Sequence, residues 1–153
     1  MPKSRGHPPL DLGQRQIRLL RIESDGGSII ACQLECFLLD EPYCPKFTAL
    51  SYRWGSPRET QLIELQGLEF QIRSNLAAFL RETKRQGSEW KDLYWIDALC
   101  IDQSNVNEKN HQVDLMAWIY YKAEKVVVWL GEGDNQHQYA LNWAASPWST
   151  GPA

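Results

Sequence analysis

Three carboxylates, Asp97, Asp102 and Glu108, follow one apolar stretch of the chain. Residues 93–96 are typical of a buried strand, so Asp97 ends that strand and Asp102 lies in the loop after it. In open α/β sheets, ligands bind at the carboxyl ends of the strands. Carboxylates there hold a cation, bind ribose hydroxyls, or act as general acid and base when burial raises a pKa. The alternative is structural, with Asp97 accepting backbone N–H bonds and Asp102 in solvent.

A helix predicted for residues 105–122 places two polar side chains on its inward stripe. Glu108 and Gln112 share this stripe with Leu115, Met116, Ile119 and Ala123 by helical spacing. A buried carboxylate or amide must find partners or face a crevice. Two interpretations stay open. Either Asn105 and Glu108 form a capping box, or Glu108 serves chemistry at the edge of the sheet.

A second group of polar side chains closes the strand predicted for residues 48–52. This group consists of Ser51, Tyr52, Arg53 and Trp54. If the two strands are neighbours, their carboxyl ends bring this group, Asp97 and Glu108 to one rim. An aromatic ring for stacking and carboxylates for sugar hydroxyls suit a nucleotide. The alternative is that Trp54 only plugs the end of the sheet.

The cysteines are expected to be reduced and metal-free. Cys32 and Cys36 fit the alternation of one strand, whereas zinc sites favour C-x₂-C spacing. Cys100 is a nucleophile only if one of the three histidines pairs with it, and a buried structural thiol is the commoner case. Gly131 and Gly133 lack the further glycine of a dinucleotide fingerprint, so no bound cofactor is expected.

Length and composition predict one globular domain. The chain has 153 residues, 43% of them hydrophobic, and a formal net charge of -3, which argues against a general nucleic-acid binder. It contains no apolar run long enough to span a membrane and no secretory signal, so we expect a cytoplasmic location. Seven tryptophans indicate an aromatic core or a recognition surface.

The expected fold is an α/β, mostly parallel sheet with antiparallel N-terminal strands and a hairpin. Strand and helix patterns alternate over residues 48–130, which favours a parallel sheet. We expect a loose arm over residues 1–14, a single domain over 15–145 and a flexible tail over 146–153. The strands are expected over 16–23, 28–39, 48–52, 61–65, 68–72, 93–96 and 126–130, and the helices over 74–87, 105–122 and from residue 139. Ser74 or Asn75 is expected to cap the first of these helices.

Three blocks resemble the fungal heterokaryon-incompatibility (HET) domain. Residues 47–55 read FTALSYRWG, similar to its ALSYxWG block. Residues 94–103 read YWIDALCIDQ, similar to WIDAxCINQ, with Asp102 where Asn is usual. A third block runs from Glu108 to VVVWLG at residues 126–131. The resemblance covers roughly residues 17–133.

The resemblance implies a function and a fold. HET domains trigger cell death when incompatible mycelia fuse, through self-association or incompatibility partner proteins. They are similar to Toll/interleukin-1 receptor-like domains, which are flavodoxin-like, and some of these relatives cleave NAD. Their catalytic acid lies on the helix after the third strand, where residues 139–145 of this chain hold no acid, leaving Glu108 or Asp97 as substitutes.

The resemblance and the rim together give the expected site. Glu108 and Asp97 are the candidate catalytic residues, and NAD is a candidate substrate. The ligand-binding candidates are Ser51, Tyr52, Arg53, Trp54, Asp102, Gln103 and Gln112. The alternatives are a non-enzymatic protein-interaction module and an inactive truncated HET protein.

Overall fold

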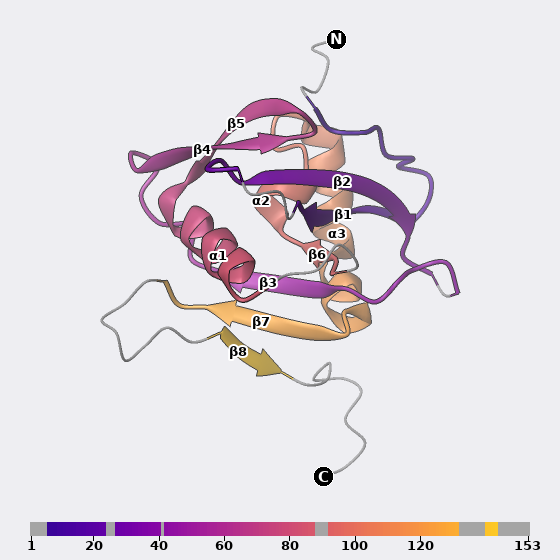
Figure 1. The fold of residues 1–153 in the computed structure, drawn as a ribbon. Helices are drawn as coiled ribbons and strands as arrows, with labels where there is room; N and C mark the ends of the chain where they lie inside the picture. The colour runs from indigo at the N-terminus through magenta and orange to yellow at the C-terminus, as the bar shows by residue number, and fades with distance from the viewer. Residues whose placement is uncertain (1–5, 24–26, 41, 88–91, 132–139, 144–153) are drawn as a thin grey trace.

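The computed structural model describes residues 6–23, 27–40, 42–87, 92–131 and 140–143. These residues form one eight-stranded sheet in the order β5-β4-β2-β1-β6-β3-β7-β8, with three helices (Figure 1). The strands are β1 (Gln16–Ile22), β2 (Ala31–Leu38), β3 (Thr48–Tyr52), β4 (Thr60–Leu65), β5 (Leu68–Arg73), β6 (Tyr94–Trp95), β7 (Lys125–Trp129) and β8 (Ala140–Trp143), and the helices are α1 (Ser74–Arg85), α2 (Asp97–Cys100) and α3 (Val106–Lys122).

The parallel part of the sheet is centred on β3. It pairs in parallel with β6 on one side and with β7 on the other, so that Ala49 lies opposite both Trp95 and Val126. Its first three residues are buried, as expected of a strand covered on both faces. The two strands are therefore neighbours, the condition set in the sequence analysis, and their carboxyl ends share one edge.

The predicted hairpin and the predicted antiparallel N-terminal pair are both present. β4 and β5 pair in register through the turn at Gln66 and Gly67. These two residues have φ values of 54° and 76°, and a two-residue turn with positive φ at both positions matches the twist of the flanking strands. β1 and β2 pair antiparallel along their length.

The whole sheet is mixed, which corrects the expectation of a mostly parallel sheet. β1 lies antiparallel to β6, which places the N-terminal pair inside the sheet, next to the parallel strands. β2 then pairs in parallel with β4, so the hairpin extends the same sheet at its far side. Strands β1–β2, β1–β6, β4–β5 and β7–β8 pair antiparallel, whereas β2–β4, β3–β6 and β3–β7 pair parallel.

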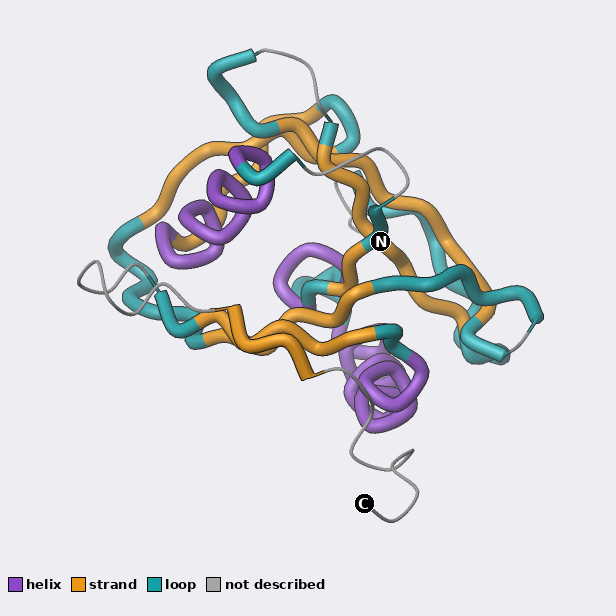
Figure 2. The backbone as a smooth tube through the Cα atoms, turned by 60° about the horizontal axis from the view of Figure 1, so that its bottom comes forward, coloured by secondary structure: helices purple, strands orange, loops and turns teal. Residues whose placement is uncertain are grey.

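Helices α1 and α3 cover opposite faces of the sheet. Successive strand residues point to opposite faces, and β6 shows this with two aromatic rings. Tyr94 meets Phe79 of α1 with ring centroids 6.4 Å apart, whereas Trp95 meets Tyr120 of α3 at 5.8 Å. The sheet curves around α1, and α3 lies on its other side (Figure 2). No helix among the described residues is long and apolar enough to cross a membrane.

The segment before β1 packs against the domain, which differs from the loose arm expected for residues 1–14. His7 is only 8% exposed, its Nε2 lies 2.9 Å from the Leu99 carbonyl oxygen, and its ring meets Phe70 edge-on. Arg18 Nε donates to the Pro8 carbonyl at 2.7 Å. Residues 6–9 are therefore fastened to β1, β5 and α2, while residues 1–5 lie outside the described part, as does the expected tail at 146–153.

Two local predictions about helices are wrong. The segment expected to begin a helix at residue 139 contains strand β8, which pairs antiparallel with β7. Helix α1 has Arg73 at its N-cap position without a side-chain cap. Neither Ser74 nor Asn75 caps it, because both are already the first helical residues. The side chain of Asn75 instead accepts a hydrogen bond from Trp129 Nε1 at 3.1 Å.

Candidate functional site at the carboxyl edge

The carboxyl ends of β3 and β6 bring an indole and a carboxylate together. Trp54 follows β3, Asp97 follows β6, and Trp54 Nε1 donates to Asp97 Oδ2 at 3.3 Å. Both side chains are half-buried. The sequence analysis expected this juxtaposition if the two strands are neighbours, and the pairing of β3 with β6 meets that condition.

Asp97 is held in a partly desolvated environment. It is the first residue of α2, a short helix that the sequence analysis missed, and its Oδ1 accepts from the Ala98 N–H at 2.7 Å. Loss of water around the carboxylate raises the pKa of Asp97, although the bonds from Ala98 and Trp54 act in the opposite direction. A carboxyl group with a raised pKa at a cleft is suited to proton transfer.

The loop that carries Trp54 is braced by the start of α1. The Arg73 guanidinium carbon lies 5.0 Å from the centre of a Trp54 ring, and Arg73 Nη1 donates to the Gly55 carbonyl at 2.8 Å. Asn75 Nδ2 donates to the Arg53 carbonyl. Since Asn75 also accepts from Trp129, one amide fixes the ends of both β3 and β7.

Trp54 lines two small cavities. One, of about 180 Å³, is lined by residues that include Tyr52, Trp54, Arg73 and Gln103. The other, of about 140 Å³, is lined by residues that include Trp54, Asp97, Gln103 and Lys109. Gln103 reaches both, and its Nε2 donates to the Asp97 carbonyl at 2.9 Å. These cavities and the residues around them form what we call the carboxyl-edge cleft.

Glu108 lies inside the domain instead of at the rim. It is 3% exposed, and its carboxylate accepts from the Arg18 guanidinium and from the Asp102 backbone N–H. Arg18 is 1% exposed and also donates to the Cys100 carbonyl at 3.0 Å. The ion pair therefore joins β1, the end of α2 and the start of α3, a structural task that accounts for a carboxylate on the inward stripe.

The capping interpretation of Glu108 holds for its backbone but not for its side chain. Asn105 caps α3, since its Oδ1 accepts from the Glu108 N–H at 3.1 Å. The reciprocal bond of a capping box does not form, because the Glu108 carboxylate is turned toward Arg18 and the Asn105 N–H donates to the Asp102 carbonyl.

Four of the remaining candidate residues lie in the interior or on the exposed surface. Asp102, which the structural interpretation placed in solvent, is 5% exposed, and its Oδ1 accepts from the Ser104 N–H and hydroxyl. Gln112 is fully buried, as its stripe predicted, and donates to the Gln16 carbonyl at 2.9 Å. Ser51 and Arg53 are exposed. Of this group, none lines the two cavities beside Trp54.

The cysteine environments favour structural thiols. Cys32 and Cys100 are buried, and desolvation raises the pKa of each to about 12. At neutral pH a thiol of this kind is almost wholly protonated and therefore a poor nucleophile. His111, one of the three histidines, has its Nε2 2.8 Å from the Gln14 carbonyl oxygen. Within the described residues, no group of three His, Cys, Asp or Glu side chains is arranged to hold a metal ion.

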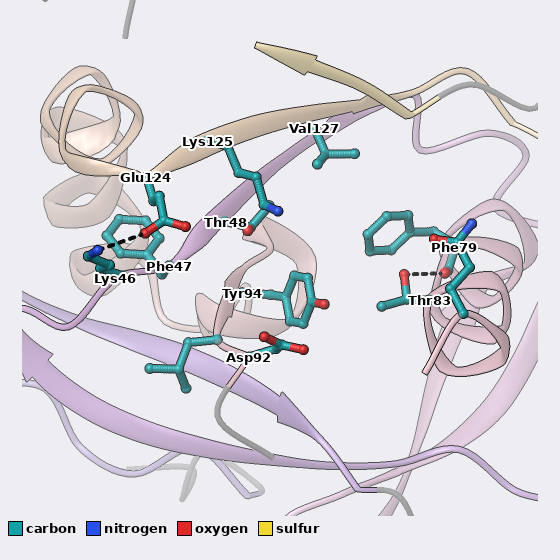
Figure 3. A pocket seen from close by; sticks show the side chains of 12 residues that line it. Lys46, Phe47, Thr48, Phe79, Thr83, Asp92, Tyr94, Glu124, Lys125 and Val127 are labelled. Atoms are coloured by element: carbon teal, nitrogen blue, oxygen red, sulfur yellow. Dashed lines mark hydrogen bonds and ion pairs between the residues drawn. The ribbon is translucent and has the colours of Figure 1, made fainter. Parts of the chain in front are cut away.

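A larger cavity lies at the opposite, amino edge of the parallel strands. It has a volume of about 510 Å³ and is bounded by the first residues of β3, β6 and β7 and by one side of α1 (Figure 3). None of the candidate residues from the sequence lines it. We call it the amino-edge cavity. Its lining residues are Lys46, Phe47, Thr48, Phe79, Thr83, Gln86, Asp92, Leu93, Tyr94, Glu124, Lys125 and Val127.

The sequence analysis missed three residues that shape these sites. Arg73 fell between the strand expected over 68–72 and the helix expected over 74–87, and Asn75 was a cap candidate. Their contacts with the Trp54 loop depend on how α1 packs beside β3 and β7. Arg18 looked like one of several arginines on a half-buried strand. Its burial has no local signal, because the partners Cys100 and Glu108 are far away in the sequence.

The fold and the cleft define an α/β domain with an aromatic ring and a carboxylate at the carboxyl edge of its parallel strands. Comparison with known protein families identifies the family of this domain. The model of the heterokaryon incompatibility protein (HET) family matches residues 47–150. The chain therefore belongs to the HET family, as its three sequence blocks indicated.

The chain is also similar in sequence to a fungal incompatibility protein. The chain is 35% identical, over 129 residues, to "Heterokaryon incompatibility protein 6, OR allele" of Neurospora crassa. The match covers 75% of this chain and 18% of the Neurospora protein, so the chain spans only a small part of that relative's length. No solved structure matches the chain.

Proposed function

We propose that this HET domain is an effector of non-self recognition that triggers cell death by associating with further copies of itself. Membership of the HET family supports a role in incompatibility. We place this activity in the cytoplasm and relate the fold to the flavodoxin-like, Toll/interleukin-1 receptor-like domains.

The observation that carries the proposal is an apolar surface on α3. Val113, Trp118 and Tyr121 are 49%, 45% and 38% exposed. Trp118 and Tyr121 meet edge-on at 5.8 Å, which keeps both rings on the same side of the helix. Exposed aromatic side chains grouped on one element are typical of protein–protein interfaces. We call Val113, Trp118 and Tyr121 the α3 surface.

The test compares association with cell killing in the same variants. Trp118→Ser combined with Tyr121→Ser should lower both self-association, measured by sedimentation velocity, and killing on expression in a fungal host. Tyr43→Ser is the matched control, because Tyr43 is 68% exposed but lies far from α3 in the sequence, in the loop between β2 and β3. If the double variant associates and kills like the wild type per folded molecule, the α3 surface is not the interface.

A second candidate function is NAD cleavage at the carboxyl-edge cleft. The observation that favours it is the partly desolvated Asp97 carboxylate beside the Trp54 indole. Cleavage of the nicotinamide glycosidic bond passes through an oxocarbenium-like state, which a carboxylate stabilises. The indole offers a stacking surface for a ring of the nucleotide. We assign no step to Glu108, whose carboxylate is already paired with Arg18.

The experiment for this candidate measures nicotinamide release from NAD at high protein concentration. The wild type should release nicotinamide, and Asp97→Asn should abolish the release while the protein stays folded by circular dichroism. Because the reaction needs the ionised carboxylate, activity should also fall as the pH is lowered through the raised pKa of Asp97. Killing without nicotinamide release would instead identify a non-enzymatic interaction module.

A further inference from the structure

The amino-edge cavity lies at the other end of the parallel strands from Trp54 and Asp97. The first residues of β3, β6 and β7, which are Thr48, Tyr94 and Lys125, line this cavity, and α1 closes it from the side (Figure 3). Its volume of about 510 Å³ falls within the range of about 300–1,000 Å³ found for small-molecule sites. It belongs neither to the carboxyl-edge cleft nor to the α3 surface.

The floor of the amino-edge cavity is apolar and aromatic. Phe47, Phe79, Leu93 and Val127 are all less than 9% exposed. The rings of Phe79 and Tyr94 meet at 81° with their centroids 6.4 Å apart, so they form a corner open toward the cavity (Figure 3). A flat ring placed in this corner can stack on one of the two rings and meet the other edge-on, the arrangements that aromatic pairs prefer.

Two polar groups, from Lys125 and Thr48, lie beside this floor. The ammonium group of Lys125 makes no ion pair, and the Thr48 hydroxyl makes no hydrogen bond, with any residue that the structure describes. These two residues lie directly opposite each other on β7 and β3. Together they offer a cation and a hydroxyl donor to a single anionic group.

The charges at the mouth limit how much negative charge a ligand can carry. Asp92 extends toward the cavity on the other side of the Tyr94 ring from Lys125 (Figure 3). Lys46 is paired with Glu124 at 3.6 Å. The formal charges of the two lysines and two carboxylates in the lining therefore sum to zero. A lining without net charge disfavours polyphosphates and favours a ligand that carries one charge of each sign.

We propose that the amino-edge cavity binds an aromatic zwitterion of the size of an aromatic α-amino acid. The ring occupies the corner between Phe79 and Tyr94. The carboxylate meets Lys125 and the Thr48 hydroxyl, and the ammonium group meets the Asp92 carboxylate. This inference does not depend on NAD cleavage or on self-association.

The first experiment titrates the full chain with three related probes by isothermal titration calorimetry. L-tryptophan carries both charges, N-acetyl-L-tryptophan only the anion, and tryptamine only the cation. L-tryptophan should bind with a dissociation constant on the order of 1 mM or tighter, as expected of a ligand of this size. Each of the other two probes should have a dissociation constant about three- to fivefold higher, because each lacks one partly exposed charge contact. Absence of saturation by L-tryptophan at about 10 mM overturns the proposal.

The second experiment assigns each charge with matched variants. Lys125→Gln should weaken L-tryptophan and N-acetyl-L-tryptophan by about three- to fivefold and leave tryptamine unchanged. Asp92→Asn should weaken L-tryptophan and tryptamine and leave N-acetyl-L-tryptophan unchanged. The matched controls at the other edge are Lys109→Gln and Asp97→Asn, which should change none of the three affinities. If a control variant weakens binding as much as its counterpart, the probe binds at the carboxyl edge and the inference is wrong.

A third variant tests the location without removing a charge. Thr83→Phe adds a ring from α1 into the cavity. Among the residues that the structure describes, it removes one side-chain bond, which Thr83 Oγ1 donates to the Phe79 carbonyl within the same helix. Binding of L-tryptophan should be lost while the thermal unfolding curve stays cooperative. A folded Thr83→Phe protein that binds L-tryptophan like the wild type overturns the proposal.

Discussion

Replacing Glu108 by glutamine should destabilise the domain more than loss of a helix cap does. The Glu108 carboxylate and the Arg18 guanidinium are both almost fully buried and bonded to each other. Breaking a buried ion pair by removing one partner costs about 3–5 kcal/mol, because the other charge stays buried without compensation. Loss of a cap costs only about 0.5–2 kcal/mol. Against a total stability of about 5–15 kcal/mol, the expected loss is a large fraction.

Urea unfolding followed by circular dichroism measures this change. The midpoint should move to lower urea at an unchanged slope, and the melting temperature should fall by about 6–20 °C, since 1 kcal/mol corresponds to about 2–4 °C in a chain of this size. Glu35→Gln is the matched control. It removes the partner of Arg21 in a pair whose carboxylate is 55% exposed, and such pairs contribute about 0–1 kcal/mol.

The opposite result would refute the structural role of Glu108. If Glu108→Gln unfolds at the same urea concentration as the wild type and yet abolishes killing, the carboxylate acts in function and not in folding. The buried ion pair predicts instead that killing by each variant follows the fraction of that variant that is folded.

Three further predictions concern pH, thiols and backbone conformation. Burial lowers the pKa of the His7 imidazole below 6.5, so as the pH falls the imidazole is protonated in the unfolded chain before it is protonated in the folded one. The stability that is present above about pH 6.5 should therefore be lost as the pH falls further. Melting temperatures of His7→Gln, measured over the same pH range, should lack that loss. Cys32 and Cys100 should resist a thiol reagent in the native protein and react only after unfolding, because both thiols are buried and protonated. Gly131→Ala should lower the melting temperature more than Gly67→Ala, because both have positive φ but only at Gly131 would a Cβ meet another atom, at 3.1 Å.

Local features of the chain were predictable from the sequence. The hairpin was predicted because Gln66 and Gly67 separate two alternating runs, and turn chemistry depends on neighbouring residues alone. Helix α3 was predicted within one residue because its apolar stripe is long and Asn105 is a strong cap. The rim pairing of Trp54 with Asp97 followed from parallel strand order, since the carboxyl ends of neighbouring parallel strands share an edge.

Features that depend on distant partners were not predictable. The insertion of β1 beside β6 rests on one pairing, of Leu20 with Tyr94, that no local pattern signals. The same insertion buries Arg18 and gives Glu108 its partner, which changes Glu108 from a rim residue into an interior one. Strand β8 was mistaken for a helix because a short apolar run has no clear period, and pairing with β7 decides its conformation.

The central position of β3 has a consequence for synthesis of the chain. Tyr52, the last residue of β3, lies opposite Trp129, the last residue of β7. At roughly 5–20 residues per second, a ribosome needs several seconds to make the intervening chain. During that interval one edge of β3, with the buried residues Ala49 and Leu50, has no parallel partner from β7. Nascent chains that stall before β7 should therefore be the ones that chaperones retain.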